Sequence, residues 1–112
     1  MSGRRMLKYV VTIEGHQVVA LIDQFGHQLS QLYIDEEFCD IYDPFISNPW
    51  KDDELGPGFW SPQWKTILRG PFLRPDGKPA LVEFQIRSGM DDVYDRILCD
   101  GKKIKRWKNK RG

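Results

Sequence analysis

The chain is poor in the residues that build disulfide scaffolds and metal centres. It contains two cysteines, Cys39 and Cys99, and two histidines, His16 and His27. Two cysteines are too few for a disulfide framework, so we expect a reducing compartment. Both histidines occupy turn segments, and the sequence has no C-x-x-C or H-x-x-x-H spacing. We therefore expect no metal site.

Long apolar runs and a cleavable leader are also missing. No segment approaches the roughly 18 apolar residues of a membrane-spanning helix. Residues 1–11 begin with positive charge, but Lys8, Thr12 and Glu14 interrupt the apolar stretch and no cleavage pattern follows. We therefore expect a soluble, cytoplasmic protein.

The common signatures of catalysis are weak. No nucleophile elbow accompanies the serine, histidine and acidic residues. The acids between Asp35 and Asp43 do not have the spacing of a calcium loop, and no glycine stands at its sharp turn. We expect a solvated acidic surface there and a protein that is not an enzyme and carries no cofactor.

One short motif, in contrast, suggests an enzyme. Pro75-Asp76, followed by Glu83-Phe84-Gln85, is similar to the metal-binding motif of the restriction-endonuclease-like superfamily. The resemblance implies a hydrolase in which Asp76 and Glu83 hold a divalent metal. However, Gln85 stands where the family has lysine, and turn chemistry already explains Asp76. A metal-dependent hydrolase is therefore our third hypothesis.

The clearest structural signal is a hairpin between residues 66 and 87. From Ala80 onward, apolar and polar residues alternate, which is typical of a half-buried strand. An apolar run from Thr66 to Leu73 precedes it, and residues 74–78, RPDGK, combine proline, aspartate and glycine in a turn. A single hairpin is marginal in water, so its apolar face requires further strands.

The first third of the chain predicts a β-meander. Residues 7–13 and 17–23 are rich in β-branched residues, and a short turn separates them. A third strand follows over 29–34. Because both faces of 7–13 carry apolar side chains, we expect this strand to be covered on both sides or to lie centrally. For Asp35 to Tyr42 we predict one or two helical turns, with Asp35 as the N-cap.

Two structures fit residues 88–107. A helix explains the apolar spacing of residues 90, 93, 94, 97 and 98. A hairpin around Asp100-Gly101 instead places Ile97 opposite Ile104 and Asp95 opposite Arg106. We prefer the hairpin because the helix leaves Ile104 unexplained.

Together these elements predict an α+β, mainly β domain. We expect a single antiparallel twisted sheet or a small, partly open barrel of about five to seven strands, with one or two short helical turns. One globular domain spans residues 1–101, and residues 102–112 form a basic C-terminal strand or tail.

Aromatic residues are concentrated in a segment that lacks regular structure. Four prolines and two glycines interrupt residues 43–63, and loops of this length are often functional. Aromatic side chains dominate interface energetics, so we expect a small non-enzymatic adaptor or inhibitor that binds another protein. Acids beside the aromatics would steer a basic partner. The alternative is that the aromatics close one end of the sheet. The predicted contact residues are Trp50, Asp52, Asp53, Glu54, Phe59 and Trp60.

Charge is unevenly distributed along the chain. Residues 102–111 carry seven bases and no acid, whereas residues 1–101 carry 10 bases and 16 acids. Clustered bases and an aromatic ring suit phosphates and unpaired bases, so our second hypothesis is a nucleic-acid-binding accessory protein. It ranks second because the acidic remainder would repel phosphates. Its candidate residues are Lys102, Lys103, Lys105, Arg106, Trp107, Lys108, Lys110 and Arg111.

Overall fold

Eight β-strands account for the described part of the chain. The computed structural model describes residues 6–23, 30–42, 63–89 and 92–110, and within these ranges it contains strands and no helix. This confirms the mainly β class. No helix in these ranges is long and apolar enough to cross a membrane. The strands are β1 (Met6–Ile13), β2 (His16–Asp23), β3 (Ser30–Ile34), β4 (Glu37–Tyr42), β5 (Lys65–Leu73), β6 (Pro79–Ser88), β7 (Asp92–Cys99) and β8 (Lys102–Lys110).

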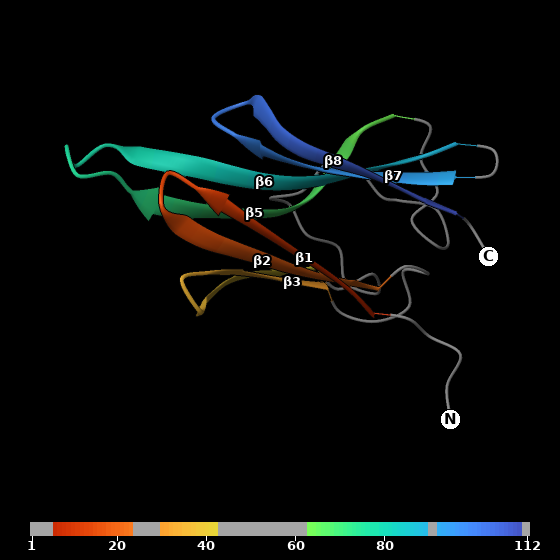
Figure 1. The fold of residues 1–112 in the computed structure, drawn as a ribbon, viewed down its shortest axis with the longest axis horizontal. Helices are drawn as coiled ribbons and strands as arrows, with labels where there is room; N and C mark the ends of the chain where they lie inside the picture. Colours follow the sequence, from red (N-terminus) through yellow and green to blue (C-terminus); the bar gives the residue numbers. More distant parts are fainter. Residues whose placement is uncertain (1–5, 24–29, 43–62, 90–91, 111–112) are drawn as a thin grey trace.

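The strands form two antiparallel sheets that face each other. The first sheet has the order β1-β2-β3-β4 and the second has the order β5-β6-β7-β8, so each is a simple meander. Figure 1 shows them as two layers. The prediction of one sheet or a partly open barrel of about five to seven strands with helical turns is wrong in these details, because the described residues form eight strands in two sheets and contain no helical turn. Each four-stranded meander presents one apolar face, and the two faces bury each other.

The core lies between the sheets and consists of inward-pointing alternate residues. In β6 these residues are at most 1% exposed, as the alternation from Ala80 to Ile86 predicts. Burial of each large apolar side chain contributes about 1.5–3 kcal/mol. The apolar residues of the first sheet that are at most 2% exposed are Val18, Ala20, Ile22 and Leu32, and those of the second are Ile67, Leu68, Ala80, Val82, Phe84, Ile86 and Ile97.

The predicted helical turn over 35–42 is wrong, because these residues form a turn and strand β4. Asp35 and Glu36 have positive φ values of 52° and 68°, which reverse the chain between β3 and β4. The Asp35 carboxylate accepts hydrogen bonds from the Gln17 backbone N–H at 3.0 Å and from His16 Nδ1 at 2.6 Å. A short acceptor side chain suits a tight turn as well as a helix N-cap, so sequence alone favoured the wrong element.

The prediction that the strand over 7–13 is covered on both sides or lies centrally is also wrong. β1 is an edge strand, and the side chains of Met6 and Val10 on its outer face are 43% and 45% exposed. Exposed apolar residues are common on protein surfaces, so their presence did not indicate a second covering layer.

The predicted hairpin around Asp100-Gly101 is confirmed, but its pairing differs. Ile97 pairs with Lys105 and Asp95 pairs with Trp107, because a β-bulge leaves Ile104 as an extra residue in β8. A bulge of this kind shifts every later pair by one position. The side chains beyond it therefore change faces relative to the simple register.

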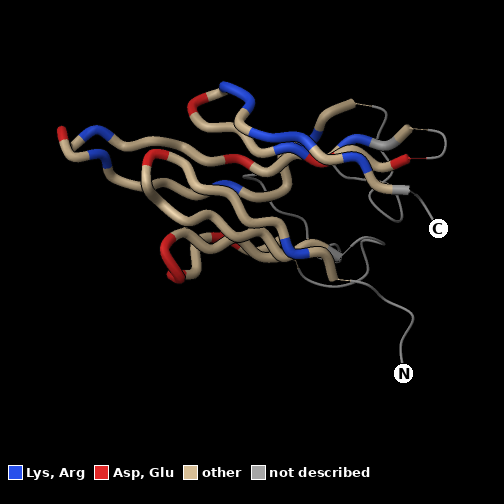
Figure 2. The backbone as a smooth tube through the Cα atoms, viewed as in Figure 1, with Lys and Arg blue, Asp and Glu red and all other residues tan. Residues whose placement is uncertain are grey.

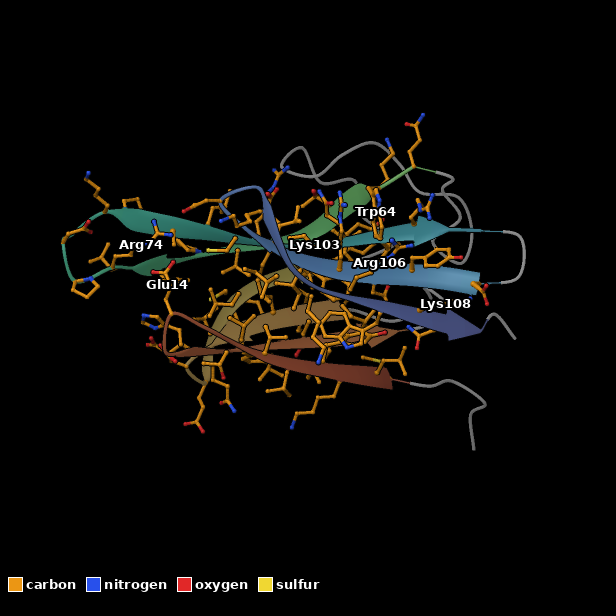
Figure 3. All side chains as sticks on the ribbon, turned by 45° about the horizontal axis from the view of Figure 1, so that its top comes forward. Glu14, Trp64, Arg74, Lys103, Arg106 and Lys108 are labelled. Carbon is orange, nitrogen blue, oxygen red and sulfur yellow. The ribbon has the colours of Figure 1, made fainter. Side chains whose placement is uncertain are left out.

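An arginine joins the two sheets at their turn end (Figure 3). Arg74, after β5, donates two hydrogen bonds of 2.9 Å to the Glu14 carboxylate in the β1–β2 turn. It also donates to Asp100 in the β7–β8 turn at 2.7 Å. Hydrogen bonds from Arg74 hold the pKa of Glu14 below its ordinary value, and a backbone N–H from Leu81, followed by Arg74, does the same for Asp100.

One close approach between the sheets requires glycine. A Cβ atom on Gly70 would lie 2.9 Å from Cys39 Cβ and 3.1 Å from Leu32 Cδ2. We therefore expect Gly70→Ala to lower the free energy of unfolding by about 1–3 kcal/mol, as overpacking does. Urea unfolding measures this change. The matched control is Gly77→Asn, since Gly77 has open space around it and asparagine tolerates positive φ. An unchanged stability of Gly70→Ala would show that the sheets can separate locally without loss.

Candidate functional site

The outer face of the second sheet carries a cluster of arginines and aromatic rings. Phe84 and Ile86 point into the core, so Gln85 and Arg87, which alternate with them in β6, point outward. Cross-strand pairing then places the partners of these two residues on the same face. Gln85 pairs with Arg96 and Arg96 with Arg106, while Arg87 pairs with Tyr94 and Tyr94 with Lys108. We call Trp64, Arg87, Tyr94, Arg96, Lys103, Arg106 and Lys108 the arginine face.

The arginines of this face stack on the two rings. Arg96 Cζ lies 4.1 Å from the centroid of the Trp64 ring. Arg87 Cζ and Arg106 Cζ lie 4.8 Å and 4.9 Å from the Tyr94 ring, and 5.4 Å and 5.8 Å from the Trp64 ring. Such contacts use the flat face of a guanidinium group, whereas its N–H donors lie at the edge. The stacking therefore orients the groups without consuming their donors.

A hydrogen-bonded chain fixes the central arginine. Arg96 Nε donates to Gln85 Oε1 at 2.8 Å, and Gln85 Nε2 donates to Thr66 Oγ1 at 2.8 Å. Thr66, which pairs with Gln85, is 2% exposed, so this end of the hydrogen-bonded chain is shielded from solvent. Among the described residues, the bond to Gln85 is the one hydrogen bond that the three guanidinium groups make. The remaining N–H donors of the three groups have no hydrogen-bond acceptor among the described residues.

The three arginines concentrate positive charge without a counterion in the described part of the chain. No carboxylate of the described residues forms an ion pair with Arg87, Arg96 or Arg106. Burial lowers the pKa of Arg96, and the neighbouring charges of Arg106 and Arg87 lower it further. The buried Nε atom of Arg87 also has no hydrogen-bond partner there. Like charges held close together lower the stability of the folded state, and such locally unfavourable arrangements occur mainly at functional sites.

Two acids of the second sheet lie near the arginine face, and each contacts a basic side chain. Glu83 lies 3.3 Å from Arg69 Nε, and Asp92 Oδ2 lies 3.6 Å from Lys108 Nζ. The latter contact is long and exposed on its lysine side, so it restrains Lys108 only weakly. A ligand can therefore recruit Lys108 in addition to the arginines.

The basic residues predicted from the sequence lie on two different faces of strand β8. The bulge at Ile104 aligns Lys103 with Arg106 and Lys108, and all three follow β8 along the arginine face (Figure 3). Trp107 instead turns inward, where its ring lies 4.3 Å from that of Tyr9. Lys102 and Lys105 pair with the inward-pointing Cys99 and Ile97, and Lys105 Nζ lies 5.6 Å from the Trp107 ring. Lys110 ends β8, and Arg111 lies outside the described residues.

Charge is separated between the two layers. Residues 6–23 and 30–42 of the first sheet contain one base and six acids, giving −5. Residues 63–89 and 92–110 of the second sheet contain twelve bases and five acids, giving +7. Figure 2 shows the bases along β7 and β8 and the acids in the turns of the first sheet. Among the described residues, the first sheet is thus net acidic and the second sheet, which carries the arginine face, is net basic.

Sequence reasoning missed four residues of the arginine face. Arg87 was predicted to point outward, but its neighbours were not known. Tyr94 and Arg96, two residues apart in β7, also point outward once 92–99 is taken as a strand. Trp64 precedes β5, and no local sequence pattern predicts its place beside Arg96, because that place depends on the whole strand order. The predicted protein-binding residues Trp50, Asp52, Asp53, Glu54, Phe59 and Trp60 lie outside the described residues, and that site stays a prediction.

The residues of the nuclease-like motif have separate partners. Asp76 Oδ1 accepts a hydrogen bond from the Lys78 backbone N–H at 2.9 Å within the β5–β6 turn. Glu83 on β6 forms an ion pair with Arg69 on the neighbouring strand β5. The described ranges contain no group of three or more histidine, cysteine, aspartate or glutamate side chains that could hold a metal ion. The residue types of this motif are therefore accounted for by turn and strand contacts.

Comparisons of the chain with models of protein families, with curated proteins and with solved structures found no match. The geometry of the arginine face is therefore the basis for assigning a function.

Proposed function

We propose that the protein is a non-enzymatic binding protein that holds single-stranded nucleic acid on the arginine face. The observation that carries this proposal is the group formed by Arg87, Arg96 and Arg106, which is oriented by Trp64 and Tyr94 and has no counterion among the described residues. Phosphates supply the missing negative charge, and their binding to arginine releases counterions from the nucleic acid.

Single strands suit this face better than duplexes. Unpaired bases expose their flat surfaces, which stack on aromatic rings and on guanidinium planes. The arginine face presents both kinds of surface side by side across three strands, since Arg87 lies on β6, Tyr94 on β7 and Arg106 on β8. In a duplex the bases are already stacked on one another, so a duplex gains only the phosphate contacts.

The described acids of the first sheet do not prevent this binding. They lie in the other layer, and packed sheets are about 10 Å apart. At physiological salt the Debye length is about 8 Å, so their repulsion at the outer face of the second sheet is largely screened. These acids therefore weaken phosphate binding at the arginine face only slightly.

Neutralising the three arginines tests the proposal. We expect the combined variant Arg87→Gln, Arg96→Gln and Arg106→Gln to bind labelled oligo(U) and oligo(dT) of about 15 nucleotides at least about tenfold more weakly at about 0.1 M salt. Fluorescence anisotropy measures the affinity. Circular dichroism and thermal unfolding establish that the variant is folded, and removal of like charges should leave its melting temperature equal or higher.

A charge-matched variant separates a specific face from a general charge effect. Lys8→Gln, Lys78→Gln and Lys105→Gln together remove the same charge from exposed positions off the arginine face. We expect this control to weaken binding by less than about threefold. Equal losses in both variants, no binding by the wild type, or tighter binding to a duplex than to the single strand would each contradict the proposal.

A further inference from the structure

The outer face of the first sheet carries an apolar band. Val10, Val19, Tyr33 and Phe38 are in register across β1, β2, β3 and β4, so their side chains form one continuous row. We call these four residues the apolar band. Leu21 and Ile41, both half-buried, lie in the next row of the same face.

The side chains at both ends of the apolar band are exposed to solvent. Phe38 is 56% exposed and Val10 is 45% exposed. The Phe38 ring packs edge-on against Tyr33 with a centroid distance of 5.8 Å, and the Tyr33 hydroxyl donates to Gln31 Oε1 at 2.6 Å. Tyr33 thus holds Phe38 from one side, and the other side of the ring faces solvent. A rigid, exposed aromatic anchor of this kind is typical of interface hot spots.

Two acidic residues precede Phe38 at the β3–β4 turn. Glu36 and Glu37 are exposed and form no ion pair with any described residue. Glu37 pairs with the inward-pointing Ile34, so its side chain points away from the face of Phe38, and Glu36 in the turn is the acid next to the band. Glu36 has a φ of 68°, a conformation in which asparagine or glycine is favoured. The first sheet carries a charge of −5 over its described residues. The apolar band therefore lies in a negative field.

We propose that the apolar band docks a partner protein whose contact surface has apolar side chains flanked by lysine and arginine. The apolar row supplies the contact area, and Glu36 together with the net negative charge of the first sheet selects the charge of the partner. A second copy of this chain fits less well, since two first sheets placed face to face bring together surfaces of the same negative sign. This site lies on the opposite face of the sandwich from the arginine face and does not depend on it.

A peptide of defined chemistry tests the site directly. The probe is a labelled peptide with alternating lysine and leucine around a central phenylalanine, and its counterpart has glutamate in place of lysine. We expect saturable binding of the basic probe and none of the acidic one, with NMR shift changes concentrated on β3 and β4. Phe38→Ser should weaken binding at least about tenfold, and Glu36→Gln with Glu37→Gln should weaken it about threefold at low salt.

The matched control is Leu73→Ser, because Leu73 is 67% exposed but belongs to the second sheet. We expect Leu73→Ser to bind the basic probe like the wild type. Equal losses in Phe38→Ser and Leu73→Ser, or no binding of the basic probe by the wild type, would overturn the proposal. Sedimentation provides a further test: a wild-type dimer that Phe38→Ser dissociates would make a second copy the occupant and would also overturn it.

Discussion

Phe84→Ala should lower the free energy of unfolding by about 3–5 kcal/mol, the largest loss expected from a single truncation in this chain. Phe84 is fully buried in β6, and its strand neighbours Leu68 and Ile97 are fully buried too. Its ring also lies 5.5 Å from the ring of Tyr9 in the first sheet. Truncation therefore leaves a cavity between the two layers, where the surrounding strands cannot close it.

Urea unfolding measures this loss, and Phe84→Leu provides the control. Leucine retains most of the apolar volume, so we expect a loss of only about 1 kcal/mol for Phe84→Leu. The dependence of the unfolding free energy on urea concentration should be the same in both variants, because the same surface is exposed on unfolding. A loss below about 1 kcal/mol for Phe84→Ala would mean that the sheets do not pack around this ring.

The second large effect is a pH dependence of the free energy of unfolding, which arises from Asp95 between the sheets. Asp95→Asn should abolish it. Asp95 is 2% exposed on the inner face of β7. Its carboxylate accepts a hydrogen bond from the Tyr9 hydroxyl of the first sheet and another from Asn109 Nδ2 at 2.9 Å. Burial raises the pKa of Asp95 to about 6, although both hydrogen bonds lower it. Burial and the nearby Asp95 charge also raise the pKa of Tyr9 above its ordinary range, so Tyr9 stays protonated and keeps donating.

The sign of the effect follows from the two pKa values. The carboxyl has a pKa of 3.8 in the unfolded chain and of about 6 in the folded protein, so between these values the folded state binds more protons. The contribution of Asp95 to the unfolding free energy therefore falls as pH rises, by about 3 kcal/mol in all. We therefore expect the free energy of unfolding of Asp95→Asn, minus that of the wild type, to rise by this amount between about pH 3.5 and about pH 7.5. A constant difference across this range would contradict the buried-carboxylate assignment.

Alternation and turn chemistry were sufficient to predict most strands of this fold. The run from Ala80 to Ile86 predicted the buried face of β6, and Asp-Gly predicted the β7–β8 turn, where Asp100 and Gly101 have positive φ. These signals are local, so they can be recognised in the sequence without knowledge of the partner strands. They do not say how many sheets the strands form.

The errors arose where local signals fit two structures. The acids at 35–37 suit a helix N-terminus, but in the folded chain Asp35 bonds to Gln17, which is distant in sequence. The bulge at Ile104 could not be anticipated from the Asp-Gly turn, and without it Arg96 and Arg106 are not predicted to be opposite each other. Long-range pairing, rather than residue type, assembles the arginine face. For the same reason, the basic C-terminal segment was read as one surface, although the two faces of β8 have different surroundings.

The two outer faces of the sandwich differ in chemistry. The second sheet presents arginine and aromatic side chains, while the first presents an apolar row beside Glu36, which forms no ion pair with any described residue. The two proposed sites therefore lie on opposite layers and can be occupied together. Phe38→Ser should leave nucleic-acid affinity unchanged, since distant sites contribute independently.

The salt dependence of oligonucleotide binding tests the central proposal most directly. If Arg87, Arg96, Arg106, Lys103 and Lys108 contact phosphates, the plot of log affinity against log salt for a single strand should have a slope of about −3.5. Replacing the three arginines by glutamine should reduce the slope to about −1.4, because two contacts remain. Equal slopes for the wild type and this variant would show that the arginine face does not contact the phosphates, and would contradict the proposed function.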